Sequence, residues 1–149
     1  MNKEPGLSLI VKVTARATVG LIMLFGIYIV STGHVSPGGG FVGGFILSLA
    51  FILLMLAYGQ KTALKKLNKN AAKYFESMGA LMLLTIATLG LASGYFLVNF
   101  ILVKGTFFEP FSAGIIPLEN IAVALKVGAG LYAIFIALIF LKVDEGGKK

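Results

Sequence analysis

The amino-acid sequence predicts an all-α integral membrane protein with four transmembrane helices. Of its 149 residues, 58% are hydrophobic and only 13% are charged, whereas soluble domains are about half apolar and about a quarter charged. The apolar residues form runs of about twenty, the length that an α-helix needs to cross a bilayer. Because the bilayer core offers the backbone no hydrogen-bond partners, such runs are expected to be helical. We therefore treat residues 1–149 as a single membrane domain.

The first predicted span covers residues 9–32 and leads into a glycine-rich turn. Pro37 fixes one backbone angle there, and five glycines follow within residues 38–44, where they permit conformations closed to other residues. The second predicted span, residues 41–58, opens with two glycine pairs at the small-xxx-small spacing that lets helix backbones approach closely in a membrane. We expect close helix approach at Pro37, Gly38, Gly39, Gly40, Gly43 and Gly44.

The third predicted span covers residues 77–103, and a basic segment, residues 60–76, precedes it. That segment carries five lysines and a single acidic residue. Because lysine-rich loops remain in the cytoplasm, we expect this loop and both chain termini to be cytoplasmic in a multi-pass plasma-membrane protein. The net charge of +7 then reflects topology and contact with anionic lipid rather than with nucleic acid. Within the third span, Gly90 and Gly94 repeat the close-packing spacing.

The fourth predicted span covers residues 119–141 and follows a second outer connection, residues 104–118. Two prolines and two glycines in this connection argue against a regular helix, and its phenylalanines argue against full exposure to water. We expect a loop that lies on the membrane surface or on a partner. Both outer connections are therefore predicted to be irregular and rich in glycine and proline.

Lys126 is the most unusual charged residue of the predicted spans. It lies seven residues into the fourth span, which is about 10 Å along the helix axis. An ammonium group at that depth costs about 2.5–3.5 kcal/mol on insertion scales, so we expect it to face protein or a hydrated cavity. Glu119, one heptad earlier, shares that face and that path. Lys126 is expected either to carry or gate ions or to form an inter-subunit ion pair.

His34, the only histidine, lies beside the glycine turn. Imidazole can relay protons near neutral pH, although a single interfacial histidine more often caps a helix or forms a hydrogen bond. With no cysteine and no second histidine, we expect no metal site. Residues 38–43 spell G-x-G-x-x-G, but a dinucleotide site also needs a preceding strand and a later acidic residue, so we expect no cofactor. The chain contains no recognisable active site, and we expect a non-catalytic subunit.

One segment is characteristic of a known family. Residues 33–44 read Gly-His-Val-Ser-Pro-Gly-Gly-Gly-Phe-Val-Gly-Gly and lead into an apolar helix that ends Leu-Ala-Tyr-Gly at residues 56–59. This segment closely resembles the B-type subunit of Mrp multisubunit sodium/proton antiporters, the MnhB-like domain. A related domain occurs in archaeal membrane-bound hydrogenases and their sulfur-reducing relatives. The resemblance implies an accessory membrane protein that works with large antiporter-like subunits, with hydrogenase or sulfur-reductase redox subunits as further partners.

One position departs from the family pattern. The last span of the antiporter subunit typically reads Phe-Asp-Ile-Gly-Val-Tyr, whereas residues 125–130 here read Leu-Lys-Val-Gly-Ala-Gly. An intramembrane acid is thus replaced by Lys126. The replacement argues against a cation-binding role at this position and favours the version of the domain that is built into a redox complex.

We therefore expect an accessory subunit of a cation/proton (Na+/H+) antiporter module within a membrane-bound respiratory complex, with a hydrogenase favoured. Its expected role is to contribute to a hydrated ion path and to pack between its neighbours. Two alternatives stay open: the B-type subunit of a free-standing Mrp antiporter, and a purely structural scaffold. An autonomous transporter is disfavoured because the four spans lack the paired broken helices that transporters use.

Overall fold

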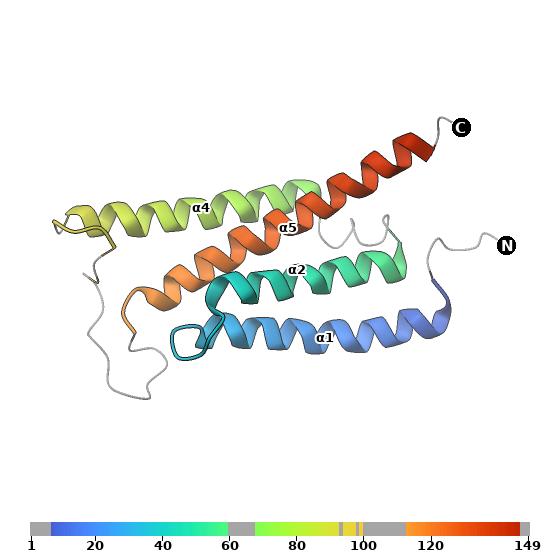
Figure 1. Ribbon diagram of the computed structural model, residues 1–149, viewed down its shortest axis with the longest axis horizontal. Helices are drawn as coiled ribbons and strands as arrows, with labels where there is room; N and C mark the ends of the chain where they lie inside the picture. The colour runs from blue at the N-terminus through green and yellow to red at the C-terminus, as the bar shows by residue number, and fades with distance from the viewer. Residues whose placement is uncertain (1–6, 60–67, 93, 98, 100–112, 147–149) are drawn as a thin grey trace.

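The computed structural model describes residues 7–59, 68–92, 94–97, 99 and 113–146. Four long helices make up most of this part of the chain (Figure 1), namely α1 (Leu9–Thr32), α2 (Gly39–Tyr58), α4 (Lys69–Ala92) and α5 (Ile116–Gly146). Each contains a stretch long and apolar enough to span a membrane: Leu9–Thr32, Gly39–Tyr58, Asn70–Ala92 and Ile116–Ile139. The predicted all-α, four-span class is therefore confirmed.

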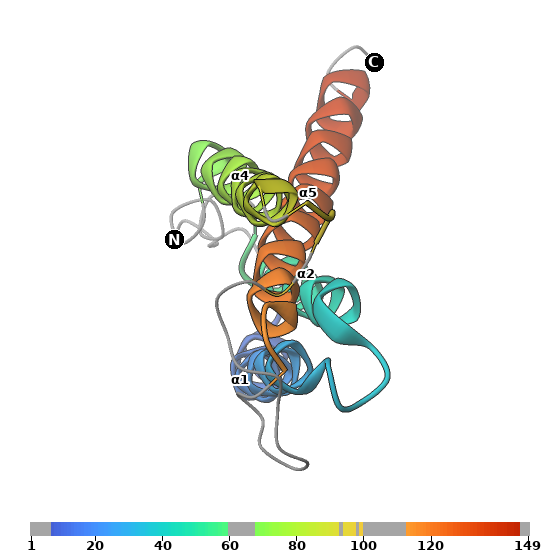
Figure 2. The ribbon, with the colours of Figure 1, turned by 90° about the vertical axis from the view of Figure 1, so that its left-hand side faces the viewer.

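The helices pack in an order that differs from their order in the sequence. Helix α1 packs along α2, α2 packs against α5, and α5 packs against α4, with a smaller contact between α1 and α5. In Figures 1 and 2 the last helix lies between α2 and α4 and is tilted across them. Helix α5 is thus the central element, and it supplies packing surface to both of its neighbours.

The third helix is displaced from its predicted range. Helix α4 covers Lys69–Ala92 rather than 77–103, because the alanines and lysines of its first turns are good helix formers and extend the span into the basic segment. At the other end, Gly94 adopts φ +91 and donates its backbone N–H to the carbonyl of Leu91 at 2.9 Å. A positive φ favours glycine, and it marks the end of the helix. Most of residues 98–103 lie outside the described part of the chain.

The other boundaries agree more closely with prediction. Helix α1 has its predicted ends, and α2 begins two residues before residue 41. Helix α5 begins at Ile116, three residues before residue 119, includes Pro117 and ends at Gly146, five residues after residue 141. Proline is tolerated in the first turn of a helix because its missing N–H has no partner there in any case.

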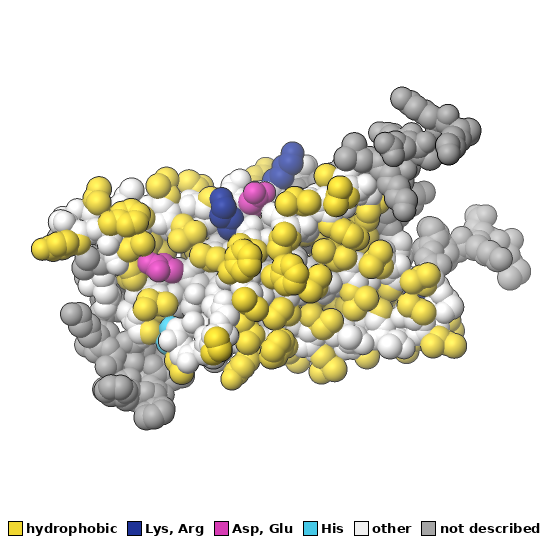
Figure 3. All heavy atoms as spheres, in the orientation of Figure 1, with side chains coloured by type: hydrophobic (Ala, Val, Ile, Leu, Met, Phe, Trp, Pro, Cys, Tyr) yellow, Lys and Arg dark blue, Asp and Glu magenta, His cyan; other side chains and the backbone are white. Residues whose placement is uncertain are grey.

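The buried core is small and consists mainly of small side chains. Tyr132 is the largest fully buried residue. It belongs to a cluster with Met55, Ala72 and Ile136, and its ring lies 5.8 Å from that of Phe51 at an angle of 58°. Outside this cluster, large apolar side chains cover much of the visible surface (Figure 3). Such a surface is suited to contact with lipid and with other membrane proteins.

The far ends of α1 and α2 are joined by a hydrogen bond. The Tyr58 hydroxyl donates to the carbonyl oxygen of Lys12 at 3.0 Å. The backbone N–H of Leu7 also donates to the carbonyl of Ala57 at 3.3 Å. These contacts hold the α1–α2 hairpin together at the end opposite its glycine turn.

Candidate functional site

The glycine turn is held against the start of α5. The first turn of α2 has no side-chain cap from its own N-cap residue, Gly38. Instead, the backbone N–H of Gly40 donates to the Oδ1 atom of Asn120, on α5, at 3.1 Å. Helix starts leave N–H groups without intrahelical partners, and Asn is among the side chains that best satisfy them. Asn120 therefore caps α2 from another helix.

Two glycines of α2 form its contact with α5. A Cβ atom added at Gly40 would overlap the carbonyl oxygen of Asn120, and one added at Gly44 would lie 2.6 Å from the carbonyl oxygen of Ala124. In the opposite direction, a Cβ at Gly128 would lie 3.1 Å from the carbonyl oxygen of Gly44. Helices α2 and α5 thus approach backbone to backbone through small residues, as membrane helices commonly do.

The remaining glycines of the turn have different surroundings. A Cβ atom at Gly43 would overlap the side chain of Val30 and lie 3.1 Å from the carbonyl oxygen of Gly26, both on α1. Gly38 and Gly39 adopt φ +135 and +60, which the turn into α2 requires. Pro37 is exposed. The turn therefore joins α1 to α2, while Gly40 and Gly44 face α5.

The predicted glycine pair of the third span, Gly90 and Gly94, does not form a close helix contact through both residues. Gly90 is buried, whereas Gly94 is exposed and a Cβ atom there would meet nothing within 4 Å. The glycine of α4 with a measured close approach to α5 is Gly79, where an added Cβ would lie 2.6 Å from the carbonyl oxygen of Ala122 and 2.7 Å from the backbone nitrogen of Lys126.

Polar groups gather where the turn meets α5. Among the residues that the structure describes, four buried side-chain atoms have no hydrogen-bond partner: Nδ1 and Nε2 of His34, Oε1 of Glu119 and Nδ2 of Asn120. His34 follows Gly33, and a Cβ atom added at Gly33 would lie 2.9 Å from Asn120 Nδ2. Two of the predicted residues, His34 and Glu119, therefore flank one contact between the turn and α5. We call His34, Glu119 and Asn120 the polar turn cluster.

Lys126 lies elsewhere on α5. It is near the middle of the Ile116–Ile139 span, its side chain is exposed, and no ion pair to it is found among the described residues. Glu76, on α4, lies one turn away across the helix contact, since a Cβ atom at Gly130 would be 3.7 Å from its Oε1 atom. Figure 3 shows acidic and basic side chains near one another over α4 and α5 on a largely apolar face.

Sequence reasoning did not single out Asn120 or Glu76. Asn120 could have been identified from the sequence, because a side-chain amide inside a membrane span usually makes a hydrogen bond to another helix. Glu76 is the one acidic residue of the basic segment. Its proximity to α5 depends on helix packing, which the local sequence does not reveal.

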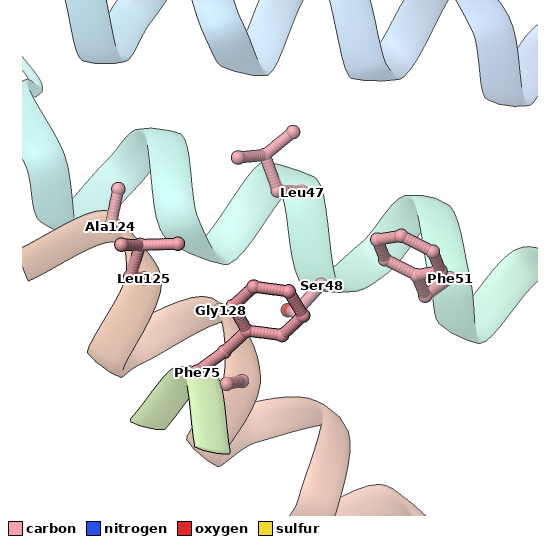
Figure 4. Close-up of a pocket in the computed structure, with 8 residues that line it drawn as sticks. Leu47, Ser48, Phe51, Phe75, Ala124, Leu125 and Gly128 are labelled. Carbon is pink, nitrogen blue, oxygen red and sulfur yellow. The ribbon is translucent and has the colours of Figure 1, made fainter. Parts of the chain in front are cut away.

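An apolar crevice of about 210 Å3 opens beside α5 (Figure 4). Its walls come from α2, α4 and α5, and its lining residues are Leu47, Ser48, Phe51, Phe75, Ala124, Leu125, Gly128 and Ala129. The one polar side chain among them, Ser48, donates its hydroxyl to the carbonyl of Phe45 at 2.7 Å. With that hydroxyl satisfied, the crevice is suited to an apolar group and not to an ion.

Together, four long apolar helices packed through glycine define a multi-pass membrane protein. Residues 10–133 match a family model described as a domain related to the MnhB subunit of Na+/H+ antiporter. The chain therefore belongs to the MnhB family, and its resemblance to B-type antiporter subunits is confirmed.

Individual relatives agree with this assignment. The B-type subunit of the Na(+)/H(+) antiporter of Bacillus subtilis is 31% identical over 149 residues, which cover 100% of this chain and 99% of the relative. An uncharacterized protein of Methanocaldococcus jannaschii is 43% identical over 128 residues, which cover 82% of this chain but 48% of that protein. This chain thus spans about half the length of the archaeal relative.

A solved structure shares the fold. A chain of the membrane-bound sulfane sulfur reductase, an archaeal respiratory membrane complex, superposes with a TM-score of 0.74 and 28% sequence identity. The match covers 90% of this chain and 58% of that chain. The domain is therefore found both in an antiporter and in a respiratory complex.

Proposed function

We propose that this chain is an accessory, non-catalytic subunit of a Na+/H+ antiporter module within a membrane-bound respiratory complex. Membership of the MnhB family supports the antiporter module, and the sulfane sulfur reductase neighbour supports a respiratory complex. The proposed partners are large antiporter-like subunits and the redox subunits of a hydrogenase or of a sulfur-reducing relative. The proposed topology places both termini and residues 60–76 in the cytoplasm, because that segment is rich in lysine.

One observation carries the proposed role in ion coupling, namely the exposed Lys126 inside a membrane span. Lipid contact at that depth would cost about 2.5–3.5 kcal/mol, and Lys126 forms no ion pair within the described part of the chain, although Glu76 lies one helical turn away. In the assembled complex this face is therefore covered by a neighbouring protein or by a hydrated path. Either arrangement places a positive charge where it acts on ions or protons moving nearby.

Replacing Lys126 by Met in the intact complex tests this proposal. We expect the complex to assemble and its sodium- or proton-coupled activity to fall, because Met keeps the apolar stem and removes the charge. Lys73→Met is the matched control, since Lys73 is exposed near the start of α4 and should leave coupling unchanged. Unchanged coupling in the Lys126→Met complex would contradict the proposal.

The rival function, a purely structural scaffold, predicts a different result. Under that hypothesis, Lys126→Met in an assembled complex has no effect, and damage comes only from variants that release the chain from its partners. Gly40→Leu and Gly43→Leu would act within the chain, because both glycines contact its own helices. A better test of docking replaces Leu84, 60% exposed on α4, by Lys and measures whether the chain still co-purifies with the complex.

A further inference from the structure

Lys126 lies too deep in its span for its own side chain to reach water. It is exposed near the middle of the Ile116–Ile139 span, about 15 Å from the nearer end of that span at 1.5 Å per residue. Lysines reach the membrane surface by snorkelling only when they lie near a helix end. A charged group inside a membrane otherwise pairs with another charged or polar group, so Lys126 needs a partner at its own depth.

The nearby acids of the described chain do not supply that partner. The Oε1 atom of Glu76 lies over Gly130, one turn farther along α5. Helical side chains lean toward the N-terminus of their own helix, and α4 and α5 run antiparallel (Figure 1). Lys126 and Glu76 therefore lean in opposite directions. On α5 itself, Glu119 lies seven residues earlier, and its Oε1 atom is buried without a hydrogen-bond partner.

Three small residues continue the side of α5 on which Lys126 lies. Gly130, Ala133 and Ala137 follow it at intervals of four, three and four residues, which place all four residues on one side of a helix. Gly130 and Ala133 are half-buried, and Ala137 is exposed. We call Lys126, Gly130, Ala133 and Ala137 the Lys126 face.

Gly130 differs from the glycines that hold the four helices together. A Cβ atom added at Gly79 or Gly44 would lie 2.6 Å from a backbone oxygen of α5. Among the described residues outside its own helix, a Cβ atom at Gly130 would meet only the Glu76 carboxylate, at 3.7 and 3.8 Å. Because small residues let membrane helices approach closely, the Lys126 face can accept a helix that the described chain does not provide.

We infer that the Lys126 face docks a membrane helix of a partner subunit, and that this helix presents the carboxylate of an Asp or Glu to Lys126. A carboxylate complements the ammonium group in charge and accepts its hydrogen bonds, and the small residues beside Lys126 let the two helices come close. The inference rests on the proposed function, in which the chain is one subunit of a larger complex. It names a neighbouring protein, and not a hydrated path, as the cover of this face.

Zero-length cross-linking of the intact complex tests the contact. Dicyclohexylcarbodiimide enters membranes and activates a carboxyl group, and an amine in contact with that group then displaces a urea and forms an amide bond. We expect mass spectrometry to find Lys126 joined to an Asp or Glu in a membrane span of another subunit. Lys126→Arg keeps the positive charge but should abolish this product, because a guanidinium group does not react in this way.

Three results would overturn the inference. A product that joins Lys126 to Glu76 would assign an ion pair within the chain. The absence of any product at Lys126 would show that no carboxylate touches it. Acylation of Lys126 in the intact complex by a membrane-impermeant ester would show that water reaches it, as a hydrated path requires.

A matched pair of alanine variants tests the small-residue part of the face. Ala137→Leu adds bulk to the Lys126 face, and Ala17→Leu makes the same change at an exposed position of α1. Both purified chains should keep their thermal stability, because neither alanine is buried within the chain. We expect retention of the chain in the complex to fall about tenfold for Ala137→Leu, since an overpacked contact is weakened, and to be unchanged for Ala17→Leu. Equal retention of the two variants would contradict docking at this face.

The outcomes separate this inference from the proposed role in ion coupling. A cross-link from Lys126 to a partner, together with unchanged coupling in Lys126→Met, would support docking and contradict that role. Loss of coupling in Lys126→Met without any such cross-link would support the role and reject docking.

Discussion

The Oδ1 atom of Asn120 accepts a hydrogen bond from the backbone N–H of Gly40 at 3.1 Å, across 80 residues of sequence. This bond caps α2 from α5 and also fixes the amide beside Gly33, the residue before His34. One side chain therefore joins the packing of the hairpin to the arrangement of the polar turn cluster.

Loss of this cap should destabilise the fold. We expect Asn120→Ala to lower the free energy of unfolding by about 0.5–2 kcal/mol, the usual cost of removing a helix cap. Circular dichroism of the purified chain during denaturation measures the change. Asn70→Ala, at an exposed position in α4, is the matched control, and equal stabilities of the two variants would contradict the capping role.

The glycine contact between α2 and α5 predicts a strong dependence on position. Gly44→Ala places a methyl group 2.6 Å from the Ala124 carbonyl oxygen, so the helices must separate, and overpacking typically costs about 1–3 kcal/mol. Gly20→Ala places the same group in open space on α1 and should be neutral or stabilising by up to about 1 kcal/mol, because Ala favours helix. Similar losses of thermal stability in both variants would show that the contact is unimportant.

The hydrogen bond at the far end of the α1–α2 hairpin can be tested by removing a single oxygen atom. Tyr58→Phe removes the hydroxyl that donates to the Lys12 carbonyl and should cost about 0.5–1.5 kcal/mol. Tyr74→Phe alters an exposed tyrosine of α4 and should cost nothing measurable. The free energies of unfolding of the two purified variants test this prediction. Equal values would show that the hydrogen bond does not stabilise the fold.

Replacing Lys126 by Met should have opposite effects on the membrane insertion of α5 and on the coupled activity of the complex. Without its charge, α5 should insert into a membrane more favourably by about 2.5–3.5 kcal/mol, although the complex should lose coupling. A glycosylation-based insertion assay of the Lys126→Met helix measures the first effect. Lys73→Met in α4, nearer a helix end, should change insertion much less, and equal changes would place both lysines at the same depth.

The proposed topology can be tested by cysteine labelling. Because the chain has no cysteine of its own, only an introduced cysteine will react. Val35→Cys lies in the exposed glycine turn, and Asn68→Cys lies at the exposed start of α4. An impermeant maleimide applied to intact cells should label the Val35→Cys variant, and the Asn68→Cys variant only after permeabilisation. The reverse pattern would invert the orientation.

Much of the fold follows from local sequence. Run length and the scarcity of charge are sufficient to predict four spans, because helix formation in a membrane depends mainly on backbone satisfaction. The start of α4 was harder to predict, since its first turns are basic and resemble a loop, yet their residues favour helix. Its end near Gly94 depends on a backbone angle that the spacing of glycines does not reveal.

The site was less predictable because it depends on contacts between distant segments. His34 and Glu119 were identified from their chemistry, but nothing near either residue indicates that they flank the same contact. Asn120 gains its importance from Gly40, which lies 80 positions earlier. The spacing of the glycines predicts that helices approach closely but not which helices, and here they are α1 and α5 of the same chain.

The central place of α5 has a consequence for biogenesis. A ribosome releases α1, α2 and α4 into the bilayer before α5 exists, and in that interval the packing of α1 along α2 is the main helix contact that can form. The small-residue surfaces around Gly44 and Gly79 remain without their packing partner until α5 is made. Helix α5 must then enter between α2 and α4, which are already inserted. The packing of the four helices can therefore be completed only after α5 has entered the membrane.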